Sequence, residues 1–166
     1  GIEIVRNNSI HLHLVGRGKV LGKYKKLVSK YGLSEFVHFH GEKAGTELDD
    51  IYDIADIGLD SMGRHRAGCF YNSTLKGKEY CAHGLPIISG VQTELDFLSD
   101  FKYYLRVPAD DSPVKMQEVV DFYHRVYDNK ENIPIIIREK TEKMFDLGKT
   151  FSPIIDYITG QGMNTL

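Results

Sequence analysis

The chain has 166 residues, of which 42% are hydrophobic and 27% charged, so it can bury a sizeable core and is neither disordered nor fibrous. Its formal net charge of −2 provides no basic surface for nucleic acid, so no nucleic-acid partner is expected. Two cysteines, Cys69 and Cys81, are too few for a disulfide framework. No apolar run approaches the roughly 20 residues of a membrane span, and Gly1 does not open a signal peptide, so we expect a cytoplasmic protein.

The first part of the chain alternates between strand and helix patterns. Residues 1–6 fit either the end of a helix or an irregular lead-in. The elements expected after them are strand 10–15, helix 20–31, strand 36–40, helix 46–54 and strand 56–59. Gly32 is placed to end the first of these helices, and Thr46 with Asp49 predicts a capping box at the start of the second. The last strand leads into a loop at 60–72.

Residues 73–90 hold the most informative pattern in the chain. Ser73 and Thr74 can each cap a helix with a side-chain oxygen. Gly84 can adopt the left-handed conformation that ends this helix, and Pro86 cannot continue it. The apolar run that follows, 85–88, predicts a strand buried on both faces. The start of the helix combines unpaired N–H groups with lysines, which is what a phosphate group binds.

One further strand and three helices complete the predicted elements. They are a strand at 103–107, a helix starting at Ser112 and Pro113, a helix from Pro134 to Gly148, and a helix from Ser152 to Gly160. Strands separated by helices imply parallel pairing with right-handed crossovers. The predicted fold class is therefore α/β, with a doubly wound parallel sheet that binds ligands beyond the carboxyl ends of its strands.

The central stretch resembles the donor-site signature of glycosyltransferase family 4, the retaining sugar-nucleotide enzymes of GT-B fold. The residues that carry the resemblance are Ser73, Leu75, Lys76, Glu79, Tyr80, Ala82, Gly84, Leu85, Pro86 and Ile87. The segments 11–18, 37–41 and 48–57 are similar to further parts of that family's donor domain. The resemblance covers roughly residues 1 to 107 and implies a Rossmann-like domain of a hexosyltransferase-type enzyme in surface polysaccharide or glycolipid synthesis.

The resemblance also implies a set of donor-binding residues. Glu79 takes the position of the glutamate that accepts hydrogen bonds from the ribose hydroxyls, and Lys76, with Ser73 and Leu75 at the helix start, is expected to meet the diphosphate. The glycines Gly16, Gly18 and Gly41 match the family's glycine turns. The nucleotide-sugar is then a substrate, and neither a cofactor nor a metal is expected.

The sequence departs from the family at one position. Tyr71 stands where the family has a first glutamate, eight residues before the second, so the carboxylate that would hold sugar hydroxyls is not there. Arg64, His65 and Arg66 lie close by, in a loop at the carboxyl end of a strand. We expect these cations to offset phosphate charge as the leaving diphosphate develops, although such a run is also found on ordinary surface loops.

Two patterns leave alternatives open. The glycine turn has the spacing GxGxxxG, one residue off the dinucleotide fingerprint, and with Glu42 downstream it permits a nicotinamide-dependent oxidoreductase. Four histidines alternate on two predicted strands and could share one side of the sheet; they are His11, His13, His38 and His40. A metal site is one interpretation, and packed or hydrogen-bonded imidazoles are the favoured one.

The resemblance also predicts that residues 1–166 are a single nucleotide-sugar-binding domain from a two-domain enzyme. The family's first strand, with its arginine and lysine, and its acceptor-binding N-terminal domain have no counterpart here. Residues 134–166 resemble the terminal helices that return toward that domain. Any contact with the inner face of a membrane would then be made through the absent half. The alternative from another class is a non-catalytic nucleotide or sugar-phosphate binding module of the same fold.

Overall fold

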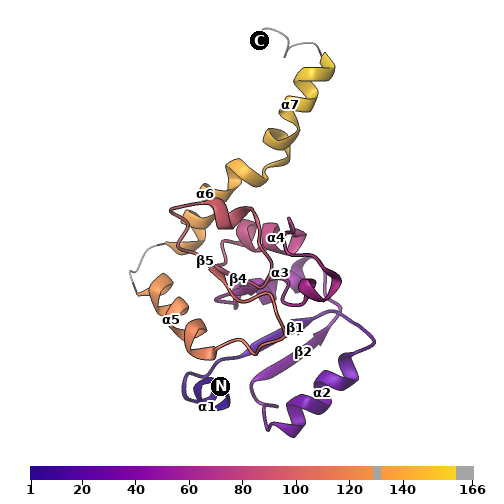
Figure 1. The fold of residues 1–166 in the computed structure, drawn as a ribbon, viewed down its shortest axis with the longest axis vertical. Coiled ribbons are helices and arrows are strands. Elements are labelled where there is room, and N and C mark those ends of the chain that lie inside the picture. The colour runs from indigo at the N-terminus through magenta and orange to yellow at the C-terminus, as the bar shows by residue number, and fades with distance from the viewer. Residues whose placement is uncertain (129–131, 160–166) are drawn as a thin grey trace. The chain divides into compact units, whose positions relative to one another are not determined.

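The computed structural model of the chain describes residues 1–128 and 132–159, and the chain divides into two compact units. The first unit comprises Gly1–Ala55 and Ser112–Arg125, and the second comprises Asp56–Asp111 and Val126–Leu166. Both contain parallel β-strands joined through helices (Figure 1). The predicted α/β class with parallel strands is confirmed.

The first unit is built on a two-stranded parallel sheet. Its elements are α1 (Ile2–Asn7), β1 (Leu12–Val15), α2 (Leu21–Lys30), β2 (Val37–Gly41), α3 (Thr46–Asp53) and the part of α5 (Met116–Tyr127) up to Arg125. In the β1–β2 register His13 lies opposite His38. None of residues 1–55 is fully buried, so this sheet has only half-buried faces.

The helices of the first unit follow the sequence patterns, with one correction. Gly32 ends α2 in the left-handed conformation, with φ 64°. The start of α3 differs from the prediction, because Gly45 is the N-cap and no side chain caps the helix. Thr46 is already inside the helix, so its hydroxyl does not stand in the N-cap position and the predicted capping box is wrong. The ambiguous first residues form α1.

The second unit is built on a three-stranded parallel sheet of order β3–β4–β5. Its elements are β3 (Gly58–Leu59), the 3₁₀ helix η1 (Arg64–Ala67), α4 (Leu75–His83), β4 (Ile87–Ser89), the 3₁₀ helix η2 (Glu94–Phe97), β5 (Tyr104–Arg106), α6 (Ile133–Phe145) and α7 (Leu147–Thr159). The central strand β4 is buried along its whole length. The core of this unit includes Ile87, Ile88 and Val91, with Ile133 and Ile137 from α6.

The central stretch folds as the sequence predicts. Thr74 is the N-cap of α4, and its Oγ1 accepts a hydrogen bond of 2.9 Å from the backbone N–H of Gly77. Gly84 ends the helix with φ 74°. The chain then enters β4 at Ile87. Of the two candidate caps, Thr74 is therefore the one that acts, and Ser73 lies just outside the helix.

Two of the three C-terminal helices begin at other residues than predicted, while α6 begins at Ile133 and has the predicted Pro134 in its first turn. The first, α5, begins at Met116 rather than at Ser112 and Pro113. The break between α6 and α7 lies at Asp146, whose Oδ1 accepts a 2.8 Å hydrogen bond from the N–H of Lys149. This acceptor starts α7 at Leu147, so Pro153 lies inside that helix and does not begin it. The predicted end at Gly160 falls outside the described residues.

The strands form two separate sheets rather than one. Within the described residues β1 pairs only with β2, and β3 pairs only with β4, so each of these strands has one neighbour. The expectation that the domain lacks its first strand stays a prediction. None of the helices in the described part of the chain is both long and apolar enough to cross a membrane.

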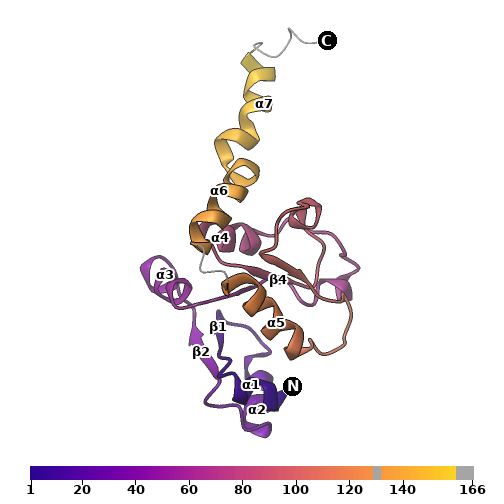
Figure 2. The ribbon, with the colours of Figure 1, turned by 90° about the vertical axis from the view of Figure 1, so that its left-hand side faces the viewer.

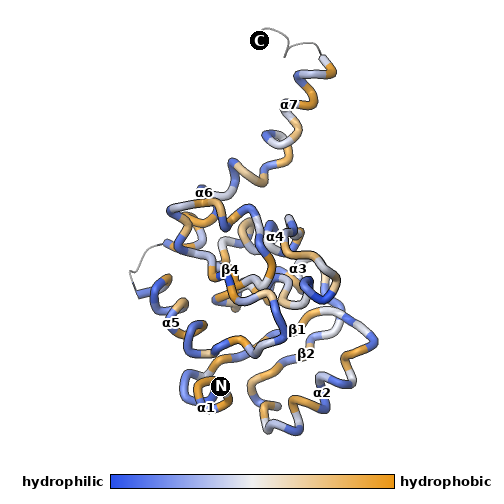
Figure 3. Tube along the Cα trace, viewed as in Figure 1, coloured by the Kyte–Doolittle hydropathy of each residue, from blue (hydrophilic) through white to orange (hydrophobic). Residues whose placement is uncertain are grey.

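The last helix has an exposed apolar side. Within the second unit α7 contacts α6 and extends away from β3–β5 in both ribbon views (Figures 1 and 2). Figure 3 shows apolar residues recurring along α7. Its exposed apolar side chains are Leu147, Phe151, Ile154, Ile155, Tyr157 and Ile158.

Candidate functional site

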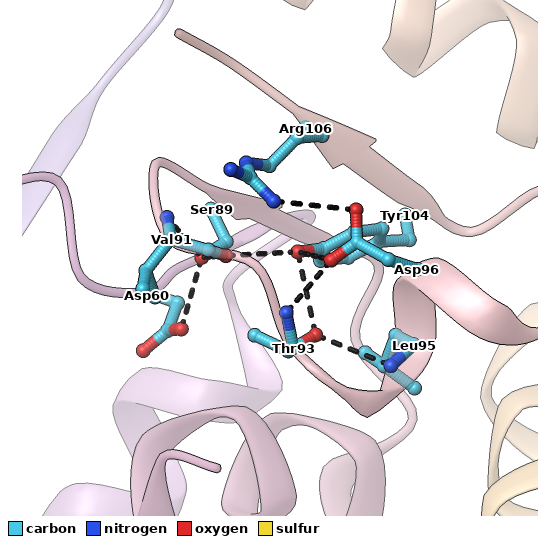
Figure 4. A network of polar contacts seen from close by, with 8 residues as sticks. All are labelled: Asp60, Ser89, Val91, Thr93, Leu95, Asp96, Tyr104 and Arg106. Carbon is cyan, nitrogen blue, oxygen red and sulfur yellow. Dashed lines mark hydrogen bonds and ion pairs between the residues drawn. The ribbon is translucent and has the colours of Figure 1, made fainter. Parts of the chain in front are cut away.

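The candidate site lies at the carboxyl edge of the three-stranded sheet. Asp60 follows β3 directly, Ser89 is the last residue of β4, and Arg106 is the last residue of β5. Figure 4 shows these three residues within one polar network. Parallel sheets of this class bind ligands beyond this edge because the loops that follow the strands gather there.

The polar network fixes the loops that leave the sheet. The Oγ of Ser89 lies 3.1 Å from Oδ2 of Asp60 and 2.9 Å from the carbonyl oxygen of Val91. Further along, Oδ2 of Asp96 accepts hydrogen bonds from the Thr93 N–H at 2.7 Å and from the Tyr104 hydroxyl at 3.0 Å. The side chain and N–H of Thr93 complete a capping box on η2.

Tyr104 is the aromatic member of this network, and Arg106 is its cationic member. Burial raises the pKa of the Tyr104 hydroxyl to about 12, so it remains a neutral donor at physiological pH. The Arg106 guanidinium lies 3.4 Å from Oδ1 of Asp96, and the two side chains are 33% and 18% exposed. These contacts connect β5 with the loop after β4, and they were not visible in the sequence as a motif.

The N-terminus of α4 opens at the same edge. The N–H groups of Leu75 and Lys76, the first two helical residues, make no hydrogen bond within the described part of the chain. The first turn carries no acidic residue. A helix N-terminus favours negative charge, so the positively charged ammonium of Lys76 is unfavourable at this position unless an anion lies close to it. Asp60 supplies one such anion, with Oδ1 at 3.8 Å from Nζ of Lys76.

Glu79 lies further along α4 and lines a groove. The groove has a volume of about 530 Å³ and runs between α4 and α6. Its lining includes Leu75, Lys78, Glu79, Arg138, Glu142 and Phe145. A separate cavity of about 10 Å³, room for one water, lies between Asp60, Thr74, Thr93 and Tyr104. The groove is the larger of these two hollows, and the small cavity cannot hold a nucleotide.

Arg64, His65 and Arg66, the basic run, lie in the 3₁₀ helix η1. The carboxylate of Asp111 contacts two of these side chains. Oδ1 of Asp111 lies 3.0 Å from Nε2 of His65 and 2.6 Å from Nε of Arg66. These hydrogen bonds, from His65 first and Arg66 second, lower the pKa of the Asp111 carboxyl. Asp111 therefore already balances part of the positive charge that was expected to offset a diphosphate. Arg64 begins the helix and makes its backbone contact with Cys69.

Tyr71 occupies a short strand-like contact. It forms an isolated parallel bridge with Gln92, and its ring centroid lies 6.4 Å from that of Phe97. Both rings are exposed. The position where the family has a glutamate therefore presents an aromatic surface in this chain.

The predicted glycines of the donor site lie in the first unit. Gly16 and Gly41 both have positive φ, 121° and 71°, and the Gly16 N–H donates to the Gly41 carbonyl at 2.6 Å. Gly18 follows in the turn before α2. Arg17 and Glu42 form an exposed ion pair of 2.8 Å across this turn.

The four histidines do share one side of the β1–β2 sheet. They form two hydrogen-bonded pairs of 2.9 Å, which are His11 with His38 and His13 with His40. Burial first, and then the charges of His38, His40 and His11, lower the pKa of His13. Among residues 1–128 and 132–159 no group of three or more histidine, cysteine or acidic side chains is placed to hold a metal ion.

The two cysteines are both free thiols. Cys81 is buried in α4, and burial raises the pKa of its thiol to about 12. Cys69 donates to the carbonyl oxygen of Tyr71 at 3.2 Å.

Sequence reasoning missed two acidic residues of this region. Asp60 was assigned only to a loop, although its place directly after a buried strand is a signal for a residue at the binding edge. Asp111 carries no local signal, because its partners His65 and Arg66 are distant in the chain. Lys76 is thus brought together with Asp60, and His65 and Arg66 with Asp111, while Glu79 lies among the groove residues.

The fold has a counterpart among solved structures. The crystal structure of Anabaena Alr3699/HepE in complex with UDP matches 91% of this chain with a TM-score of 0.59 and 15% sequence identity. The chain spans 41% of that protein's chain. No protein-family model and no curated protein sequence matches. The likeness shows the fold, a Rossmann-like α/β domain of the GT-B type, and membership of glycosyltransferase family 4 stays a prediction.

Proposed function

We propose that this chain is the donor-nucleotide-binding domain of a retaining glycosyltransferase, of hexosyltransferase type, in surface polysaccharide or glycolipid synthesis. The arrangement that carries the proposal is the open N-terminus of α4 with Lys76, set at the carboxyl edge of a parallel sheet. The fold shared with a protein solved in complex with UDP supports it. The sequence signature around Glu79 supports it independently.

The proposed chemistry assigns each part of the donor to a different group. The diphosphate meets the N–H groups of Leu75 and Lys76, the Lys76 ammonium and the Ser73 hydroxyl. Arg64, His65 and Arg66 offset the charge that develops on the leaving diphosphate. Glu79 accepts hydrogen bonds from the ribose hydroxyls. No metal takes part in this scheme, so UDP affinity should be the same with and without EDTA.

Glu79 offers the most direct test of donor binding. We expect the chain to bind UDP with a Kd of about 0.1 to 10 mM. Glu79→Ala should weaken this binding by about 2 kcal/mol, since it removes charge-assisted hydrogen bonds to the ribose. An NMR titration measures the affinity, and circular dichroism checks the fold.

A matched control separates this role from a change in net charge. Glu139→Ala removes an exposed carboxylate from α6 that is not part of the groove lining. It should leave the UDP affinity unchanged. Equal affinity of Glu79→Ala and the parent chain would contradict the ribose assignment.

We further propose that the chain acts as part of a two-domain enzyme. Retaining transfer requires the acceptor hydroxyl near the anomeric carbon, and orientation of this kind accounts for about 7 to 11 kcal/mol of a barrier. The chain spans 41% of the structural neighbour's chain, and the exposed apolar side of α7 offers a surface for further chain. The partner would be an N-terminal acceptor domain, which would also make any membrane contact.

The isolated 166 residues should therefore transfer no sugar even where they bind UDP. A donor-hydrolysis and transfer assay, run beside a longer chain that includes an acceptor domain, measures this. Turnover by the 166 residues at the rate of the longer chain would show that the catalytic groups lie here. The loop that contains Arg64 and Tyr71 would then be the first place to mutate.

A second candidate function is a non-catalytic nucleotide or sugar-phosphate binding module. The observation that favours it is Tyr71, which puts an exposed ring where the resembled enzymes have a carboxylate. An absence of transfer by the longer chain, together with UDP binding, would support this alternative. Transfer by the longer chain would exclude it.

A further inference from the structure

Asp60 has an unusual position for a carboxylate. Its side chain is 0% exposed, and its backbone N–H donates to the carbonyl oxygen of Ile88 at 2.9 Å, which continues the β3–β4 ladder. The Ser89 hydroxyl lies 3.1 Å from its Oδ2 (Figure 4). The sheet therefore fixes both the backbone and one carboxylate oxygen of Asp60.

A buried carboxylate is costly unless a cation accompanies it. The cation at Asp60 is Lys76, with 3.8 Å between Nζ and Oδ1. The lysine side chain is 51% exposed, so its ammonium lies between a buried anion and the solvent. It can contact both Asp60 and a bound anion, whereas Asp60 itself has no access to one.

The placement of Lys76 on α4 is a second reason why its ammonium needs an anion nearby. Side chains of a helix lean toward its N-terminus, so the lysine in the first turn extends past the open N–H groups. The helix dipole would drive a free ammonium away from this position. Asp60 opposes that repulsion and limits the many rotamers that a lysine otherwise samples.

We propose that Asp60 is a positioning residue for nucleotide binding. It holds the Lys76 ammonium at the N-terminus of α4, so that the cation and the helix N–H groups converge on one phosphate before the ligand arrives. This inference rests on the proposed nucleotide-binding function. Asp60 acts only through Lys76 and does not touch the nucleotide.

Asp60→Asn separates this role from a structural one. The amide oxygen can still accept from Ser89, but the ion pair with Lys76 is lost. Removal of a negative charge near a bound anion should by Coulomb's law alone tighten binding. A weaker affinity therefore indicates lost positioning, and it should appear only when Lys76 is present.

The experiment is a double-mutant cycle with UDP as the probe. UDP affinity is measured by NMR titration for the 166-residue chain, Asp60→Asn, Lys76→Met and the double variant. We expect Asp60→Asn to weaken binding about fivefold in the parent chain, and in the Lys76→Met background to leave it unchanged or slightly tighter, because only the Coulomb effect then remains. Asp100→Asn, an exposed carboxylate elsewhere in the unit, controls for net charge and should change nothing.

Each outcome decides between distinct conclusions. Unchanged or tighter UDP binding by Asp60→Asn overturns the inference, and so does equal weakening in both backgrounds, which would indicate a structural role. A parent chain that does not bind UDP overturns the proposed function and the inference with it. If Asp60→Asn does not fold, NMR relaxation of the lysine side chains in the parent chain tests the inference instead. Lys76 should then be less mobile than the exposed Lys26, and equal mobility contradicts the inference.

Discussion

The two sheets of this chain share an α/β pattern but differ in burial. None of residues 1–55 is fully buried, whereas all three residues of β4 in the second unit are. Hydrophobic burial is the dominant stabilising contribution to a fold, so most of the stability should reside in the second unit. The difference teaches that one alternating sequence pattern can produce elements of very different local stability.

Two helix-ending glycines provide the strongest test of this comparison. Gly32 and Gly84 both adopt the left-handed conformation, with φ 64° and 74°. A Cβ at Gly84 would lie 2.4 Å from the backbone Cα of Pro134, while one at Gly32 would meet only the flexible end of Arg6 at 3.2 Å. Both alanine variants place a side chain at a positive φ that favours glycine. Only Gly84→Ala also forces the backbone at residue 84 away from the backbone of Pro134.

We therefore expect Gly84→Ala to destabilise the second unit by more than about 3 kcal/mol and Gly32→Ala to cost about 1 to 2 kcal/mol. Urea unfolding of both variants, followed by residue-resolved hydrogen exchange, measures the two effects. Equal losses would contradict the expectation that most of the stability resides in the second unit.

Two ion pairs, one in each unit, provide the second test, because they differ in exposure, in contact distance and in further hydrogen bonds. The side chains of Asp96 and Arg106 in the second unit are 18% and 33% exposed, and Asp96 also accepts two further hydrogen bonds. Arg17 and Glu42 in the first unit form a shorter contact of 2.8 Å but are 82% and 59% exposed.

Asp96→Asn should cost about 1 to 3 kcal/mol, since it removes the charge that pairs with Arg106 and leaves one acceptor oxygen for the donors of Thr93, Tyr104 and Arg106. Glu42→Gln should cost less than about 0.5 kcal/mol, because solvent screens an exposed pair. Thermal unfolding of both variants measures the difference. A larger effect of Glu42→Gln would show that contact distance rather than burial decides the contribution.

The smallest expected effect concerns the histidine pairs of the first unit. The lowered pKa of His13 means that the unfolded chain takes up a proton at a higher pH than the folded sheet does. The stability that neutral His13 contributes to the folded sheet is therefore fully present above its ordinary pKa of 6.5, and it declines as the pH falls below that value. His13 is partly exposed, so the loss should not exceed about 1 kcal/mol.

Hydrogen exchange of the β1 and β2 amides, converted to opening free energies at pH 7.5 and 5.5, measures this effect. The β4 amides serve as the reference, and His13→Gln should remove the pH dependence. A loss of the same size in β4 would show that the effect does not come from the histidine pairs.

The elements near the candidate site were largely predictable. Thr74, Gly84 and the apolar run after it defined α4 and β4, because capping, positive φ and burial are local or periodic signals. The start of α6, expected at Pro134, was predicted to within one residue, whereas the starts of α5 and α7 were not predicted correctly. Ser112 and Pro153 resemble helix starts, but the Asp146 carboxylate begins α7 earlier, at Leu147.

The sequence by itself determined the α/β class, the helix–strand unit around Thr74 and Gly84, and the placement of Lys76 and Glu79 on one helix. Only the tertiary structure decided which charges meet. Asp60 pairs with Lys76 because the β3–β4 ladder places it beside the start of α4, and Asp111 reaches His65 across 46 positions of the chain. Caps and periodicity act over a few residues and can be read from the sequence, whereas ion pairs between loops depend on how the strands are ordered in space.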